Sequence, residues 1–437
     1  MTGAVRGARG TSDIRRPVTS KKPLFGASVG TLIEFYDFAV YALTVPVIAS
    51  QFFPAGDPGV ALIYAFAVYG VAFVARPLGG IVFGAIGDRL GRRRVLTLVL
   101  TLIGLATALI GVLPTYAEVG VFAPVLLVVL RLMQGLSAGG EVTSATSFIL
   151  EHAPAQRRSM WITFVVATSA VASIIGLLVV LGFTVGMTDE TFANWGWRVP
   201  FLLALPLSLF GLYLRLRTDE SPSFEEAKRS SALSTRPVRD AITRNGAAVW
   251  FAFALASMTG LAFYYLAGYF PTYLEVTAKL SRGDALFANG VALVVFAVAL
   301  PACGLAADRF GRRPAIRLGA ALLVLTSVPA FMLAGHAGLL GAIVGQLLLA
   351  LSLAVFGSGS YVALVEMFPT RTRATGAAIG YNVGYALFGG TAPLLGSVLV
   401  ETIGVPEAPG YHVALVALLV LLATLRIPET KDVDINA

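Results

Sequence analysis

Four ionisable residues interrupt otherwise apolar stretches of this sequence: Glu34, Asp37, Arg76 and Arg131. A charged side chain at the centre of a bilayer costs at least about 2.5 kcal/mol on insertion scales, so each needs a partner or a function. Two carboxylates close together in a low dielectric cannot both stay ionised, so we expect Glu34 or Asp37 to hold a proton at neutral pH. Because a neighbouring arginine favours proton release, these residues predict proton binding that is linked to whether an anion occupies the arginine. The alternative is a set of static buried ion pairs that fix helix packing.

Helical spacing places these groups at a common depth. Glu34 and Asp37 are three residues apart and Tyr41 is four further on, so the three share one helix face. At 1.5 Å per residue, Glu34 lies roughly 15 Å from the start of its helix, near the middle of a membrane. Arg76 is expected at a similar depth in the next helix.

A second polar face follows in another predicted helix, where Arg131, Gln134 and Glu141 recur at helical spacing. Glu141 follows Gly139 and Gly140, so helix packing is an equal alternative for it. The candidates for proton coupling are Asp37 and Glu34. The candidates for substrate binding are Arg131, Arg76, Gln134, Glu141, Tyr41, Tyr265, Asn382 and Tyr385. Aromatic residues of this kind also occur as packing or interfacial belts.

The elements that position these residues are predicted to be membrane-spanning helices. Of 437 residues, 57% are hydrophobic and 13% charged, against about 25% charged in soluble proteins. This composition excludes a soluble enzyme, a disordered chain and a collagen-like repeat. Long continuous apolar runs exclude a β-barrel, so the predicted fold class is an all-α membrane protein. Twelve apolar stretches are each long enough to cross a bilayer: 25–50, 60–86, 94–114, 121–150, 159–185, 197–216, 246–274, 284–306, 314–335, 338–365, 372–400 and 410–427.

Cysteine and histidine exclude other chemistry. The single Cys303 cannot form an intrachain disulfide, and the three histidines lie far apart without metal-ligand spacing. We therefore expect no metal site, no cofactor and no catalysis, and the absence of GxxxxGK[ST] argues against an ATP-driven pump. The net charge of +8 does not indicate nucleic-acid binding, because the position of the basic residues in the sequence follows the membrane topology described next.

Most of the 32 Lys and Arg residues fall in alternate connections between the apolar stretches, which places both termini in the cytoplasm of a multi-pass plasma (inner) membrane protein. The expected domains are a disordered basic tail (1–23), a six-helix bundle (24–216), a cytoplasmic linker (217–245), a second six-helix bundle (246–428) and a short cytoplasmic tail (429–437).

A repeated loop motif relates the two halves. Gly84-x-x-x-Asp88-Arg89-x-Gly91-Arg92-Arg93 recurs as Gly304-x-x-x-Asp308-Arg309-x-Gly311-Arg312-Arg313, and Glu151-x-x-Pro154-x-x-x-Arg158 recurs as Glu366-x-x-Pro369-x-x-x-Arg373. Two echoes at nearly one offset indicate internal duplication, as in many secondary transporters. The aspartate and arginines of each loop predict a charge-assisted lock across the cytoplasmic mouth. If these loops served only as signals of membrane topology, their arginines would be explained, but the repeated glycines and aspartate would not.

The repeated loop resembles the signature of the major facilitator superfamily, and residues 30–41, 75–80, 131–141 and 195–201 resemble its metabolite:proton symporter branch. That branch includes proline/betaine, α-ketoglutarate, citrate and shikimate permeases. Phe35-Tyr36 departs from the Trp-Phe or Trp-Tyr usual there.

The resemblance implies twelve helices in two pseudo-symmetric bundles and proton-coupled import of a small carboxylate-bearing metabolite by alternating access. It also implies a protein that interacts with substrate, protons and lipid and acts as a monomer. The alternatives are symport of a zwitterionic osmolyte such as proline or betaine, and, less favoured, efflux of a drug or metabolite. A channel is a rival from another class.

Overall fold

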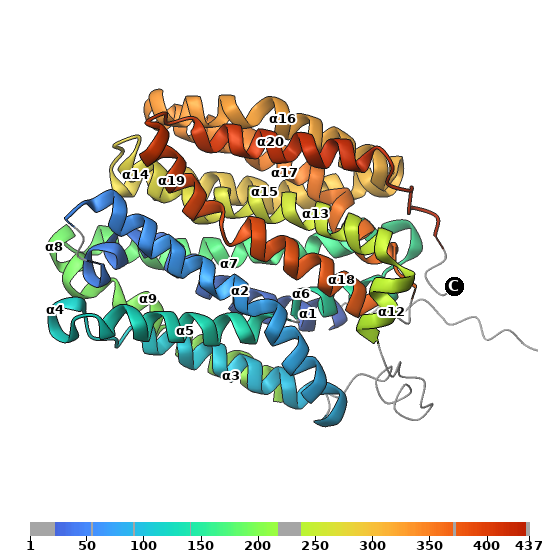
Figure 1. Cartoon of the computed structure of the whole chain (residues 1–437), viewed down its shortest axis with the longest axis horizontal. Helices are drawn as coiled ribbons and strands as arrows, with labels where there is room; N and C mark the ends of the chain where they lie inside the picture. The colour runs from blue at the N-terminus through green and yellow to red at the C-terminus, as the bar shows by residue number, and fades with distance from the viewer. Residues whose placement is uncertain are drawn as a thin grey trace, which may run out of the picture.

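The computed structural model describes residues 22–53, 56–90, 92–139, 141–216, 237–369 and 373–433. Every regular element in these ranges is a helix, and the long helices lie side by side as a bundle (Figure 1). The bundle has two ends. We call the end at which α1 begins the inner end, because it is predicted to face the cytoplasm. The opposite end, where α4, α8 and α14 lie, is the outer end.

The first half of the chain contributes the following elements: α1 (Lys22–Phe52), α2 (Pro58–Leu90), α3 (Arg92–Ile110), α4 (Tyr116–Val119), α5 (Phe122–Ala138), α6 (Glu141–His152), η1 (Ala155–Arg157), α7 (Arg158–Gly186), α8 (Asp189–Thr191), η2 (Phe192–Gly196), α9 (Arg198–Leu202) and α10 (Ala204–Leu216).

The second half contributes a matching series: α12 (Pro237–Arg244), α13 (Gly246–Tyr264), η3 (Tyr265–Tyr269), α14 (Phe270–Val276), α15 (Arg282–Phe310), α16 (Arg312–His336), α17 (Gly338–Glu366), α18 (Arg373–Gly384), η4 (Tyr385–Gly389), α19 (Ala392–Ile403) and α20 (Ala408–Thr424).

The predicted all-helical membrane fold is confirmed. Among the described residues, nine helical segments are long and apolar enough to cross a membrane, and three shorter apolar helices (Thr97–Ile110, Phe122–Ala138 and Ala408–Thr424) occupy the remaining predicted stretches. Most of the predicted tail 1–23 and of the linker 217–245 lies outside the described residues, although α12 forms the end of that linker segment.

Several spans are interrupted in ways the apolar pattern did not reveal. The stretch 121–150 divides into α5 and α6 after Gly139, and π-helical turns η3 and η4 break the stretches 246–274 and 372–400. A π-helical turn leaves backbone carbonyls without their usual partner and often occurs at functional positions.

Glycine sets the closest helix contacts. A Cβ atom at Gly135 of α5 would collide with the carbonyl of Ala72 in α2, and one at Gly79 of α2 would collide with Leu136. The two backbones therefore touch, as small residues permit in membrane bundles. At Gly311, between α15 and α16, φ is 107°, a conformation that favours glycine.

The two halves meet along helices distant in sequence. α7 of the first half packs against α15 and α17 of the second, and α2 packs against α19 and η4. This central seam crosses the bundle lengthwise (Figure 1). The charged residues predicted from the sequence lie on α1 and α2, which contact the second half, and on α5, which packs against α2.

Candidate functional site

The first buried acid forms an ion pair with α2. Glu34 Oε1 and Arg76 Nη2 lie 2.5 Å apart, and both side chains are almost completely buried. The guanidinium carbon of Arg76 is 4.8 Å from the ring centroids of Phe38 and Phe73. Its Nε and Nη1 atoms have no hydrogen-bond partner among the described residues. Within the described residues, these two buried N–H positions could bind another anion.

The second buried acid belongs to a separate network. Asp37 Oδ1 accepts hydrogen bonds from Thr107 Oγ1 at 2.9 Å and Gln134 Nε2 at 2.5 Å. Its Oδ2 atom lies 3.8 Å from Arg131 Nη1 and accepts no hydrogen bond within the described ranges. Protonation of Oδ2 would therefore break none of these bonds. Glu34 and Asp37 thus have different arginine partners.

Arg131 is held in place by neighbours of the same half. Its Nη1 donates to Gln134 Oε1 at 2.8 Å, and its guanidinium carbon lies 3.9 Å from the ring centroid of Tyr41. The Tyr41 hydroxyl donates to the carbonyl of Ala65 at 3.0 Å. In this conformation Tyr41 and Gln134 orient Arg131 and Asp37, and neither lines the central pocket.

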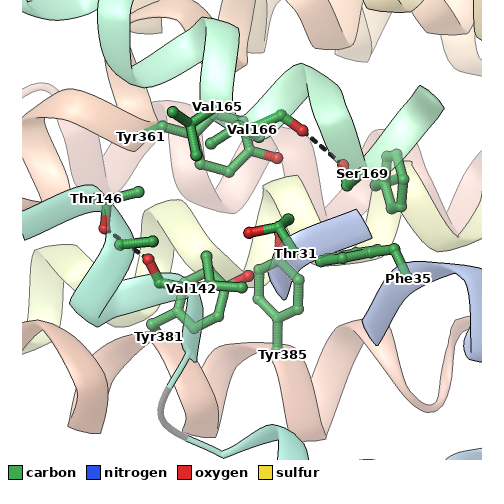
Figure 2. Close-up of a pocket in the computed structure, with 12 residues that line it drawn as sticks. Thr31, Phe35, Val142, Thr146, Val165, Val166, Ser169, Tyr361, Tyr381 and Tyr385 are labelled. Carbon is green, nitrogen blue, oxygen red and sulfur yellow. Dashed lines mark hydrogen bonds between the residues drawn. The ribbon is translucent and has the colours of Figure 1, made fainter. Parts of the chain in front are cut away.

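A pocket lies between the halves (Figure 2). Its lining consists of aromatic rings, hydroxyls and small apolar groups: Thr31, Phe35, Val142, Ala145, Thr146, Val165, Val166, Ser169, Phe263, Tyr361, Tyr381 and Tyr385. A smaller apolar cavity of about 190 Å³ shares Phe35 and Phe263 with it and adjoins Tyr264. The Tyr264 hydroxyl is buried without a partner in the described part of the chain.

The predicted substrate residues of the second half separate into different roles. Tyr385 lines the pocket. Tyr265 instead lies 2.9 Å, hydroxyl to Nδ1, from His412 within its own half. Asn382 donates to the carbonyl of Gly139 at 2.8 Å and so ties the two halves together. The side chain of Glu141 lies outside the described residues.

Two further contacts join the halves. Asn382 donates to the carbonyl of Gly139, and the rings of Phe66 and Tyr269 approach to 5.9 Å between centroids. Each of these contacts links one half to the other.

Comparison with known proteins decides the family. The chain matches the family model "Sugar (and other) transporter" over residues 24–241 and again over 223–437. It belongs to this transporter family. The transporter is thus a multi-pass membrane protein, and its predicted place among metabolite:proton symporters of the major facilitator superfamily is confirmed.

Named relatives of the transporter cover most of its length. It is 33% identical over 422 residues to the glycine betaine/proline/ectoine/pipecolic acid transporter OusA of Dickeya dadantii, covering 94% of this chain and 84% of that one. It is 36% identical over 424 residues to the inner membrane metabolite transport protein YhjE of Escherichia coli, covering 95% and 96%.

A solved structure shares the fold. The xylose transporter XylE of E. coli, in a partially occluded inward-open conformation, matches the transporter with a TM-score of 0.75 and 20% identity over 94% of this chain and 98% of that one. The twelve-helix architecture in two pseudo-symmetric bundles is confirmed by this likeness.

The second copy of the repeated loop connects the halves of the transporter at the inner end. The Asp308 carboxylate accepts from the backbone N–H groups of Ser159, at 2.9 Å, and Met160, at 3.0 Å, at the start of α7. Arg312 Nη1 lies 3.2 Å from Asp308, and its Nε and Nη2 each donate to Glu366 at 3.2 Å. These contacts have the geometry expected of a lock, and its gating role stays a prediction.

Other members of the repeated loops have different positions. The Arg309 guanidinium lies over the ring of Phe310, 5.4 Å from its centroid, within its own half. The first copy of the loop lies largely outside what the structure describes. This holds for Gly91, for the surroundings of Gly84, and for the side chains of Asp88, Arg89, Arg92 and Arg93.

The segment after α20 adds contacts that the sequence did not predict. Glu429 accepts from the backbone N–H groups of Arg312 at 2.8 Å and Arg313 at 3.0 Å, at the start of α16. Partial burial raises the pKa of Glu429, but its backbone N–H donors outweigh this effect and hold the pKa below its usual value. Arg158 of the first half donates to the carbonyl of Val433 at 3.2 Å, so this segment bridges both halves.

We expect Asp308→Asn to favour opening of the inner end, because the substitution weakens the charged cap that the second half places on α7. A helix cap is worth about 1–2 kcal/mol, so the open population should rise about 5- to 30-fold. The measurement is maleimide labelling of Ala145→Cys in a Cys303→Ala background, with reagent supplied only to the inner face. Arg309→Gln is the matched control, since among the described residues the Arg309 guanidinium contacts Phe310 of its own half. Equal labelling of both variants would show that Asp308 is not part of the gate.

Proposed function

We propose that the transporter is a proton-coupled symporter that imports a small zwitterion of the proline or betaine class by alternating access. The observation that carries this proposal is the Arg76 guanidinium, which is buried against Phe38 and Phe73 with two N–H positions that no described residue bonds. A carboxylate is the ligand that such a planar group binds best.

The aromatic lining favours a zwitterion over a simple organic anion. An ammonium group, quaternary ones included, binds the faces of Tyr and Phe rings, and Phe35, Phe263, Tyr381 and Tyr385 surround the pocket. Glu34 adds negative charge beside Arg76. A substrate with both charges would complement both features, and relatives named as proline/betaine transporters support the same choice.

The preferred sequence interpretation, import of a carboxylate-bearing metabolite, keeps its chemical basis in this proposal, since proline and betaine are carboxylates. What changes is the second charge. A dicarboxylate bound at Arg76 would bring additional negative charge next to Glu34, which disfavours it. The feature that would favour a dicarboxylate is the presence of two buried arginines.

Asp37 is our candidate for the coupling proton. Its Oδ2 atom is free of hydrogen bonds among the described residues, and Arg131 is 3.8 Å away. We infer that Asp37 takes a proton from the outer side, that substrate binds at Arg76, and that the halves then rock about the pocket. In this cycle the inner end faces the cytoplasm, both termini are cytoplasmic, and one chain holds the complete site, so a monomer suffices.

The substrate class is tested with purified transporter in detergent. Ligand at about 100 times its Kd adds about 2.7 kcal/mol of stability, so proline or glycine betaine should raise Tm by several degrees. Succinate and xylose are the comparison compounds, each at two pH values. Stabilisation by succinate alone would favour the organic-anion alternative, and stabilisation by xylose alone would overturn both.

Coupling and direction need a second measurement in vesicles of known orientation. An imposed inward proton gradient should drive accumulation of the stabilising compound above its outside concentration. Gradient-driven extrusion would instead support the efflux alternative, and uptake that never exceeds equilibrium would indicate a channel.

A further inference from the structure

Arg282 stands at a position that does not stabilise its own helix. It is the first residue of α15, directly after the N-cap Ser281, where the positive end of the helix dipole disfavours a cation. Asp284, two residues later, is the charge that suits this helix start. The side chain of Arg282 instead leaves α15 and reaches the first half of the chain.

The guanidinium of Arg282 makes two contacts across the seam. Its Nη2 donates to the carbonyl of Leu43 in α1 at 3.0 Å, and its central carbon lies 4.7 Å from the ring centroid of Phe192 in η2. The side chain is 13% exposed, so water screens these contacts little. Both partners belong to the first half and lie at the outer end.

The sequence of α1 explains why a carbonyl is accessible there. Pro46 lies inside α1, three residues after Leu43. Its missing N–H leaves the carbonyl of Ala42, four residues earlier, without its helical partner, and its ring loosens the turn that also contains Leu43, so that a group from a neighbouring helix can bond a carbonyl of this turn. Arg282 supplies such a group from the other half.

Glu275 holds Arg282 in this direction from within the second half. Its Oε1 lies 3.6 Å from Arg282 Nη1. Both residues would move together if the halves separated, whereas Leu43 and Phe192 would stay behind. The contacts to the first half are thus the ones that opening must break.

We propose that Arg282 is the outer latch of the transporter: a positioning residue that closes the outer mouth by binding the α1 carbonyl at Leu43 and the Phe192 ring. Its contact on α1 lies about 9 Å along the helix from Asp37, because Leu43 follows Asp37 by six residues. The latch requires alternating access but does not depend on which substrate is carried.

The latch is tested by labelling from outside intact cells. The reporter is Ala267→Cys in a Cys303→Ala background, since Ala267 is buried in the small cavity beside the pocket. Arg282→Gln should raise the rate of labelling by an impermeant maleimide about tenfold, the effect of losing one charge-assisted hydrogen bond. Arg282→Lys keeps the positive charge but not the planar guanidinium, so its labelling rate should lie between those of the parent and of Arg282→Gln.

Lys279→Asn is the matched control. Lys279 is an exposed outer cation of the same connection, and its φ of 58° is one that asparagine tolerates. In the Lys279→Asn variant the reporter cysteine should be labelled at the parental rate. Phe192→Leu, which leaves Arg282 intact, should raise labelling about threefold, and it keeps the test decisive if Arg282→Gln fails to fold. Parent-rate labelling in folded Arg282→Gln, or in Phe192→Leu where that variant alone folds, would overturn the proposal.

Discussion

Asp37→Asn is expected to abolish uptake against a concentration gradient while leaving exchange of substrate for substrate. Asparagine can keep the hydrogen bonds from Thr107 and Gln134 but cannot bind and release a proton at this site. Without proton coupling, a symporter can still cycle with bound substrate in both directions. Proteoliposomes that measure gradient-driven uptake and counterflow in parallel provide the test, and concentrative uptake should fall to the level of empty liposomes.

Glu190→Gln is the control for this substitution, because Glu190 is an exposed acid on α8 at the outer end. It should leave both activities unchanged. Concentrative uptake by Asp37→Asn at parental levels would exclude Asp37 as the coupling residue. Failure of the variant to fold would support the alternative of a static ion pair with Arg131.

Arg76→Gln is expected to remove substrate binding. The substitution takes away the unbonded N–H groups of the guanidinium and leaves Glu34 as a buried carboxylate without its arginine. Arg76 and the substrate carboxylate would form a buried charge pair. Truncating one partner of such a pair costs about 2–5 kcal/mol, which corresponds to a loss of thirtyfold or more in substrate affinity. Tryptophan fluorescence or thermal shift with glycine betaine measures binding directly.

A double substitution separates binding from folding. Glu34→Gln together with Arg76→Gln removes both charges, so no buried charge is left alone and the fold should recover. If the pair only fixes packing, the double variant should bind and transport substrate. If Arg76 binds the carboxylate, the double variant should fold and still fail to bind. Arg76→Lys, which retains the charge without the fork, should bind weakly.

The fold was predictable because the bilayer leaves few choices. Long apolar runs of spanning length can only be helices, and the described helices occupy all twelve predicted stretches. The breaks inside spans were not predictable from hydropathy. η3 and η4 contain apolar and aromatic residues like their neighbours, so their average character does not reveal a change in hydrogen-bond register.

The charged part of the site was predictable for a different reason. Burying Glu34 or Asp37 is so costly that each had to have a partner, and Arg76 and Arg131 were the buried cations available. Which acid pairs with which arginine depends on how α1, α2 and α5 rotate, and sequence spacing does not fix this rotation. Thr107 was missed because a hydroxyl in an apolar helix usually bonds its own backbone, as Thr107 also does with Ile103 at 2.7 Å.

The lining of the pocket was the least predictable part. Val165, Val166 and Ser169 of α7 carry no charge and differ little from lipid-facing residues in type. The spacing of Ser169 and Ser173, four residues apart in an apolar helix, was the available signal.

Gln346 provides a comparison between the halves, since the offset that relates Glu151 to Glu366 also relates Arg131 to Gln346. The second half thus carries an amide where the first half carries a cation.

The pairing of acids with arginines also has an electrical consequence. With both pairs ionised, Glu34, Asp37, Arg76 and Arg131 sum to zero, so the empty carrier moves no net charge of these groups through the membrane potential when its lobes reorient. In the proposed cycle, loading with one proton and a neutral zwitterion would add a single positive charge, for which a potential of 100 mV is worth about 2.3 kcal/mol. Voltage would then act on the loaded step alone, and an interior-negative potential would drive the inward step without hindering the return.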